Sequence, residues 1–165
     1  MRSLILIVTG ADDSGKEKLV AGISEIPVIE VPQAGTSNGS TVAISFGRLA
    51  LSEDLFLYLV ALPPEETYRF LWHRAQADLV GFVMVHDVGS GKISETAKAI
   101  EAIAGYVDAP WVLAPHSVPS GKDAKTMAAK LSLDSKVAVV TWRLGDKESA
   151  RKVVATVLAK AKETV

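Results

Sequence analysis

The chain has 165 residues, of which 48% are hydrophobic and 22% charged, and this balance excludes a disordered chain or a fibre and predicts one packed domain over residues 1–165. Eighteen Lys and Arg stand against nineteen Asp and Glu, a formal charge of −1 that argues against binding nucleic acid through phosphate contacts. The absence of Cys excludes disulfides, thiolate catalysis and Cys-ligated zinc.

Apolar stretches long enough for targeting or membrane insertion are not found. Residues 4–8 form an apolar run too short for the core of a signal peptide. The longest candidate span, residues 49–63, is interrupted by Ser52, Glu53 and Asp54. We therefore expect a soluble, cytoplasmic protein without a membrane span.

Short apolar runs alternate with amphipathic stretches in the first half of the chain, which is typical of βα units around a mostly parallel sheet. Residues 3–9 predict a buried strand, and a helix with Leu19, Val20 and Ile23 on its apolar face follows. Residues 31–40 are rich in Pro, Gly, Ser and Asn and predict a loop. Residues 41–48 and 55–61 then predict an antiparallel hairpin.

The same alternation continues to the end of the chain. Further strands are expected over residues 79–86, 111–114 and 137–141. Helices are expected over residues 65–77, from Ser90 to about 107, over 122–131 and over 146–163. In the helix that follows Ser90, the spacing turns Ile93, Ala97, Ile100, either Ile103 or Ala104, and Val107 inward. Six strands and these helices predict a three-layer α/β domain with a mostly parallel sheet and one antiparallel hairpin strand.

The most specific motif lies between the first strand and the first helix. Gly10-Ala11-Asp12-Asp13-Ser14-Gly15-Lys16-Glu17 fits G-x-x-x-x-G-K but has Glu17 where a Ser or Thr would hold Mg²⁺. Backbone N–H groups of such a loop surround phosphate oxygens at a helix N-terminus, and the Lys reaches the outer phosphates. Two further carboxylates inside the loop oppose a polyanion, so the electrostatics disfavour tight triphosphate binding. A plain strand-to-helix turn remains the structural alternative.

The order of elements, this loop and the hairpin together resemble the small Ras-like GTPases, which are P-loop NTPases. The closer resemblance is to the prokaryotic MglA polarity switch and the conservon-type GTP-binding proteins. The stretches that carry it are Ser24-Glu25-Ile26, Ser40-Thr41-Val42-Ala43-Ile44-Ser45-Phe46-Gly47-Arg48, Leu57-Tyr58-Leu59, Pro63 with Glu66, Gly81, and Asp87. The resemblance implies a Ras-like G domain that binds GTP or GDP with Mg²⁺, in which Thr41 contributes to the metal.

Three further positions depart from what the resemblance implies. Pro64 falls where the family has a Gly whose N–H contacts the γ-phosphate, and Glu65 falls where it has the Gln that orients the attacking water. Pro119 falls where an Asp reads guanine. With Glu17 at the metal, four parts of one site are altered together, which predicts a pseudo-GTPase.

Histidines and aromatic residues give weaker predictions. His73, His86 and His116 show no metal-ligand spacing, so we expect them at the surface or at helix caps. Aromatic residues cluster around the hairpin and the next helix, where Ras-like proteins meet their partners. The partner surface that follows from this consists of Phe46, Tyr58, Tyr68 and Trp72. Burial of most of these rings in the core is the alternative.

The leading hypothesis is a catalytically degenerate G domain that acts as a protein-interaction module, with nucleotide absent or weakly bound as GTP or GDP with Mg²⁺. Its vestigial phosphate site consists of Gly10, Asp13, Ser14, Gly15, Lys16, Glu17 and Thr41. The resemblance implies a roadblock or longin-type domain as partner. One alternative is a working P-loop NTPase that uses Lys16, Ser14 and Thr41, and another is a protein that binds a small anion at the loop.

Overall fold

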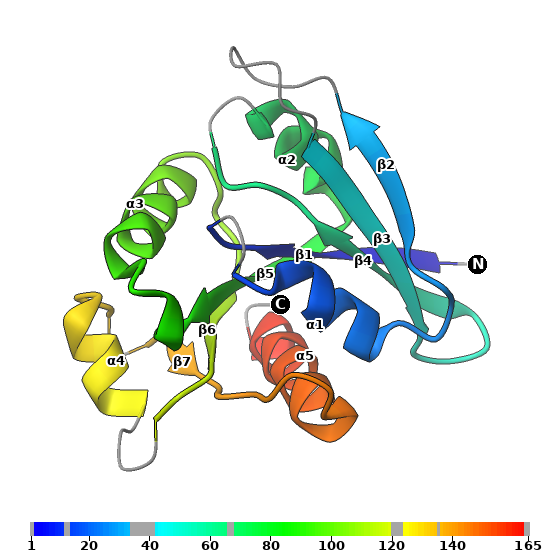
Figure 1. The fold of residues 1–165 in the computed structure, drawn as a ribbon. Helices are drawn as coiled ribbons and strands as arrows, with labels where there is room; N and C mark the ends of the chain where they lie inside the picture. Colours follow the sequence, from blue (N-terminus) through cyan, green and yellow to red (C-terminus); the bar gives the residue numbers. More distant parts are fainter. Residues whose placement is uncertain are drawn as a thin grey trace.

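One sheet of seven strands forms the centre of the molecule (Figure 1). The computed structural model describes residues 2–11, 14–33, 42–65, 68–119, 124–134 and 136–163. The strands are β1 Arg2–Thr9, β2 Ile29–Gln33, β3 Val42–Ala50, β4 Leu55–Ala61, β5 Leu79–Asp87, β6 Trp111–His116 and β7 Ala138–Val139. The helices are α1 Lys16–Ile23, α2 Arg69–Ala75, α3 Ile93–Ala104, α4 Ala124–Lys130 and α5 Lys147–Glu163.

The strands follow the order β2-β3-β4-β1-β5-β6-β7, with β1 near the middle. Strand β1 is parallel to β4 and β5, and β6 and β7 continue the parallel part. Strand β3 is antiparallel to both β2 and β4, which confirms the predicted hairpin. The connections on the two sides of β1 leave in opposite directions, so a crevice is expected at the carboxyl end of β1 and its neighbours.

The prediction of six strands is wrong by one, because residues 29–33 form the edge strand β2 where we expected a loop to begin. Pro32 lies inside this strand, and proline is tolerated in sheets mainly at such edges, where it disguises the strand in the sequence. The rest of the expected loop, residues 34–40, lies outside the described residues.

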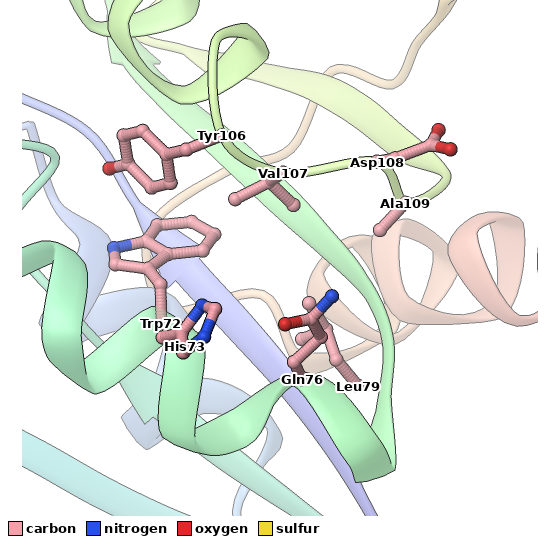
Figure 2. Close-up of a pocket in the computed structure, with 8 residues that line it drawn as sticks. All are labelled: Trp72, His73, Gln76, Leu79, Tyr106, Val107, Asp108 and Ala109. Atoms are coloured by element: carbon pink, nitrogen blue, oxygen red, sulfur yellow. The ribbon is translucent and has the colours of Figure 1, made fainter.

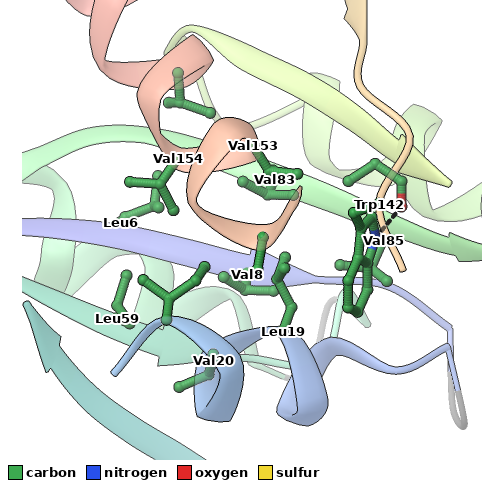
Figure 3. Close-up of a cluster of buried hydrophobic side chains, with 14 of the residues drawn as sticks. Leu6, Val8, Leu19, Val20, Leu59, Val83, Val85, Trp142, Val153 and Val154 are labelled. Carbon is green, nitrogen blue, oxygen red and sulfur yellow. Dashed lines mark hydrogen bonds between the residues drawn. The ribbon is translucent and has the colours of Figure 1, made fainter. Parts of the chain in front are cut away.

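Two hydrophobic clusters cover the two faces of the sheet. One joins β1, β4 and β5 to α1 and α5, with Leu19, Val20, Val153 and Val154 among its fully or almost fully buried members (Figure 3). The other lies on the opposite face, under α2, α3 and α4. The predicted apolar faces of the first and last helices are confirmed, and the sheet between these two helical layers gives the three-layer architecture.

The inward face of α3 differs from the prediction. Thr96, Ala99 and Ile103 are buried, whereas Ala97 is exposed. Buried Thr96 bonds to a histidine on β5, a polar contact that an apolar pattern cannot register. Several predicted bounds also differ. Helices α2 and α3 are shorter than residues 65–77 and 90–107. Strand β7 has two residues instead of 137–141, and β6 runs two residues beyond 114, to His116.

Candidate functional site

The candidate site lies where β1, β5 and β6 end together at one edge of the sheet. Strand β1 ends at Thr9, β5 at Asp87 and β6 at His116, and His116 is opposite Asp87 in the register of the two strands. Gly10 follows β1, and a Cβ placed there would lie 2.6 Å from the carbonyl oxygen of Val85. Only glycine allows the loop to pass this close to β5.

The loop turns directly into α1. Ser14 N–H donates to the carbonyl oxygen of Ala11 at 3.0 Å, and α1 begins at Lys16. Gly15 has φ +98°, in the left-handed region, and a Cβ on it would lie 2.8 Å from Nε2 of His116. The predicted strand-loop-helix context of the motif is therefore present, and Gly15 is required both by its backbone angle and by the histidine against it.

The ammonium group of Lys16 is buried inside this loop. Its side chain is 5% exposed, and Nζ donates to the carbonyl oxygen of Gly10 at 3.4 Å. Oε1 of Glu17 lies 3.6 Å from the same Nζ, with the Glu17 side chain 42% exposed. The positive charge that would meet a phosphate is thus folded back onto the loop and paired with a carboxylate of the next residue.

His116 connects β6 to the loop. Its Nε2 donates to the carbonyl oxygen of Ser14, and its Nδ1 lies 3.0 Å from the hydroxyl of Ser117. A carbonyl oxygen only accepts, so Nε2 carries a proton, and Nδ1 forms its hydrogen bond with the Ser117 hydroxyl. The ring also packs at 4.9 Å from that of Trp142, whose Nε1 donates to the carbonyl of Ala114 at 2.9 Å. The loop is therefore held from β6.

The Ser14 hydroxyl is a buried polar atom without a partner among the described residues. Ser14 is 4% exposed, and its Oγ lies 2.6 Å from the position that a Cβ of Gly10 would take. Leaving a buried hydroxyl unbonded costs about 1–3 kcal/mol. In the described part of the loop, this unpaired hydroxyl favours binding of an anion or a water molecule at the start of α1.

A second histidine, His86, is buried beside the first. It is 3% exposed, and its Nδ1 lies 2.7 Å from Oγ1 of Thr96 on α3. Burial lowers the pKa of His86 below 6.5, and neighbouring His116 lowers it further while Asp87 raises it. The His86 imidazole is therefore neutral near pH 7.

The segment after β4 is fixed by aromatic residues. Nε1 of Trp72 donates to the carbonyl of Pro63 at 3.5 Å, and the hydroxyl of Tyr106 donates to that of Pro64 at 3.4 Å. Trp72 also meets Phe82 edge-on at 5.5 Å. Figure 2 shows Trp72 and Tyr106 near one another on a pocket of about 50 Å³. Both prolines are buried, whereas Glu65 is exposed.

The structure brings most of the predicted phosphate site together. Gly10, Ser14, Gly15, Lys16 and Glu17 form one loop at the end of β1. Asp13 and Thr41 lie outside the described residues. Pro119 is exposed, three residues beyond the end of β6.

Two members of the predicted partner surface are misplaced. Tyr68 and Trp72 are 4% and 2% exposed, so their rings belong to the core and the prediction that they are accessible is wrong. The apolar face of α2 turns toward the sheet, which draws Trp72 inward. Phe46 is half-buried against the same cluster, and Tyr58 is 36% exposed. Of the four aromatic residues, Tyr58 is the most accessible.

The histidines correct a second prediction. His86 and His116 are buried, not at the surface; His116 ends β6, and His86 is the last residue but one of β5. The signal in the sequence was that each closes a buried apolar run, where a polar residue must find a partner. His73 is exposed on α2, as expected. Across the described residues, no three carboxylates or imidazoles gather closely enough to hold a metal ion.

No helix in the described part of the chain is long and apolar enough to cross a membrane.

No family model matches the sequence, and no curated protein sequence is significantly similar to it. The structure is similar to that of an ADP-ribosylation factor-like GTP-binding protein, the small COPII coat GTPase SAR1 of Encephalitozoon cuniculi in complex with GDP. That match has a TM-score of 0.62 and 15% identity, and covers 98% of this chain and 82% of the other.

The structure is also similar to that of the G domain of the T. maritima FeoB iron transporter. That match has a TM-score of 0.66 and 12% identity, and covers 97% of this chain and 99% of the other. These likenesses confirm the predicted fold class. The chain has the α/β fold of Ras-like G domains, with a mostly parallel sheet and one hairpin.

Proposed function

We propose that this chain is a catalytically degenerate G domain that acts as a protein-interaction module and does not hydrolyse GTP. The observation that carries the proposal is the pairing of Lys16 with Glu17 at 3.6 Å inside the phosphate loop. A buried lysine whose charge is already compensated has little attraction left for phosphate, because an incoming anion must displace the carboxylate or lie beside it. We place the protein in the cytoplasm on the absence of Cys.

The donor set does not fit a magnesium-bound triphosphate. Phosphoryl transfer depends on positioned groups that neutralise developing charge. Glu17 supplies a carboxylate where the loop of a working G domain supplies a hydroxyl, and that carboxylate is occupied by Lys16. Pro64 has no N–H to offer. We therefore derive no catalytic step through a nucleotide.

Fixation of the segment after β4 supports the same proposal. A nucleotide-dependent switch needs a segment that exchanges between two arrangements. The carbonyls of Pro63 and Pro64 accept hydrogen bonds from Trp72 and Tyr106, and Trp72 is 2% exposed. Moving Pro63 and Pro64 would break both bonds and leave the buried indole N–H of Trp72 without an acceptor. These contacts therefore favour one arrangement of Pro63 and Pro64.

Restoration of the lost groups tests the proposal. Binding of a fluorescent guanine nucleotide with Mg²⁺ is measured for the native chain, for Glu17→Thr, and for Glu17→Thr with Pro64→Gly and Pro119→Asp. We expect no saturable micromolar binding by the native chain, and a gain of about tenfold or more on removal of the Glu17 charge. Glu25→Thr is the matched control, because Glu25 pairs with Arg48 at 3.4 Å outside the loop. Micromolar binding and turnover by the native chain would refute the proposal.

The partner surface that we propose lies on β2, β3 and the outer side of α2. Ile29 and Val31 are 56% and 39% exposed and are paired with Phe46 and Ile44, so they extend the same face of the sheet. Phe70 on α2 is 55% exposed. A groove of about 230 Å³, lined by the sheet and α2, lies on this face. Exposed apolar groups around a groove are typical of protein interfaces.

A roadblock or longin-type domain is the partner class we propose, in line with the family resemblance of the sequence. Affinity for purified domains of this class can be measured with native chain and with Val31→Lys. A charge at this position should weaken binding by about tenfold or more. Leu144→Lys, on a side chain 45% exposed before α5, is the control and should change nothing. Equal effects of the two variants would argue against this surface.

A nucleotide-binding G domain with divergent motifs is the second candidate. The buried Ser14 hydroxyl without a partner favours it, because a phosphate oxygen at the start of α1 would satisfy that group. Ser14→Ala separates the two candidates. Under the leading proposal it removes an unsatisfied group and leaves nucleotide binding absent, whereas a working site would lose affinity.

A further inference from the structure

A second cavity, away from the phosphate loop, lies between the end of β5, the start of α3 and α4. Its volume is about 420 Å³, within the range of small-ligand pockets. Among the described residues, those that line it are His86, Val88, Gly91, Ile93, Met127 and Lys130. It lies on the face of the sheet opposite α1 and α5, and neither Lys16 nor Ser14 contributes to it.

The proton on His86 can be assigned from its neighbour. Thr96 is 1% exposed, and among the described residues the only hydrogen bond of its hydroxyl is the one of 2.7 Å with Nδ1 of His86. If the hydroxyl accepted from Nδ1, its own hydrogen would be buried without an acceptor, which costs free energy. The hydroxyl therefore donates to Nδ1, and the neutral ring carries its proton on Nε2. Among the described residues nothing else pairs with Nε2, so the His86 side chain, which lines the cavity, retains a free N–H donor.

Lys130 supplies the positive charge. It ends α4, is exposed, and forms no ion pair or hydrogen bond with any described residue. Lys130 and His86 line the same cavity from different elements, α4 and β5. The cavity is therefore bordered by two residues whose Nζ and Nε2 donors have no acceptor among the described residues.

The remaining wall is apolar. Met127 is 6% exposed and belongs to the hydrophobic cluster under α4, while Val88 and Ile93 pack partly against that cluster. Gly91, with φ +73°, leaves open space where a side chain would stand. The cavity can thus hold the hydrocarbon part of a ligand while its polar end meets the two donors.

We propose that this cavity binds a small organic monocarboxylate, with one oxygen on Nε2 of His86, the other on the Lys130 ammonium, and the hydrocarbon body on Met127, Val88 and Ile93. A carboxylate has two oxygens for two donors. A phosphate would bring at least three oxygens and a second charge, for which this cavity supplies no further donor side chain among the described residues. The proposal is independent of the state of the phosphate loop.

Methyl NMR of the intact protein tests it. The chain has three Met, of which Met127 lines the cavity, whereas Met84 is fully buried in the sheet and serves as internal reference. Titration with hexanoate should shift the Met127 signal saturably and leave Met84 unmoved. Lys130→Met should weaken the affinity by about tenfold, the loss expected for one charge-assisted hydrogen bond. Lys152→Met, on α5 at the other face, is the matched control and should bind as the native chain does.

Thr96→Val tests the role of the histidine without removing its ring. Without the hydroxyl the proton is no longer held on Nε2, and hexanoate affinity should fall while the fold is retained. A Met127 signal that does not respond to millimolar hexanoate would overturn the proposal. So would inorganic phosphate that binds as tightly as hexanoate, or a Lys130→Met variant indistinguishable from Lys152→Met.

Discussion

The imidazole of His116 donates a hydrogen bond to the backbone carbonyl of Ser14, a residue 102 positions earlier in the chain. Through this bond the end of β6 fixes the loop that leads into α1. The same ring lies 2.8 Å from where a Cβ of Gly15 would stand, so loop and histidine exclude any larger residue between them. The His116 ring therefore occupies the space beside Gly15, between the end of β6 and the start of α1.

Removing this ring should destabilise the protein. His116→Ala leaves the Ser14 carbonyl buried without a donor and opens space beside Trp142, and we expect a loss of about 1–3 kcal/mol in the free energy of unfolding. Urea denaturation followed by Trp fluorescence measures it. His73→Ala, on an exposed histidine of α2, should change stability by less than about 0.5 kcal/mol. Similar values for both variants would contradict the structural role of His116.

Replacing Gly15 and Gly22 by alanine should change the stability of the protein in opposite directions. Gly15→Ala places a Cβ in the left-handed region and against His116, and should cost at least about 1–2 kcal/mol. Gly22→Ala lies within α1, where its Cβ would be 3.7 Å from that of Ala150, and should stabilise by up to about 1 kcal/mol. Thermal denaturation of the two variants in one buffer compares them. A stable Gly15→Ala protein would show that the loop is arranged differently.

Two aromatic residues of α2 should differ sharply in their contribution. Trp72→Ala removes a ring that is 2% exposed and the donor to Pro63, and should cost about 3–5 kcal/mol. Phe70→Ala, on a ring 55% exposed, should cost less than about 0.5 kcal/mol. If Phe70→Ala proved the more damaging, the orientation of α2 on the sheet would be wrong.

Stability should fall in mild acid because of His86. Burial lowers its pKa in the folded state below 6.5, so the unfolded chain binds a proton more readily. This contribution is fully present above pH 6.5 and is lost as the pH falls toward the folded-state pKa. Asp87 opposes the shift and His116 adds to it. Melting temperatures between pH 8 and 5.5 should decline for the native chain and decline less for His86→Gln. Parallel curves would exclude His86 as the cause.

Periodicity predicted the parts of the fold that bury one apolar face. Strand β1, the hairpin of β3 and β4, and helices α1 and α5 were found in this way, since their patterns repeat over two turns or several alternations. Strand β2 was missed because it has only five residues and contains Pro32, a residue that usually argues against a strand. The face of α3 was misjudged because Thr96 is buried through a hydrogen bond and not through its hydrophobicity.

Only the part of the candidate site that lies within one short sequence motif could be predicted from the sequence. Gly10, Gly15 and Lys16 occupy one short segment, so their spacing alone placed them at the end of β1. The ion pair of Lys16 with Glu17 was not foreseen, because adjacent residues meet only when the backbone turns their side chains together. His116 and His86 act across the sheet, and no local pattern indicates which strand ends lie beside each other.

The proposal that this chain neither binds nor hydrolyses GTP is tested most directly by calorimetry. The unmodified chain is titrated with GTP and Mg²⁺, and a single-turnover hydrolysis assay follows on the same sample. Because the ammonium of Lys16 is already engaged by Gly10 and Glu17, we expect no binding heat at micromolar concentrations and no phosphate release above the uncatalysed rate. A saturable micromolar isotherm, abolished by Lys16→Ala, would contradict it.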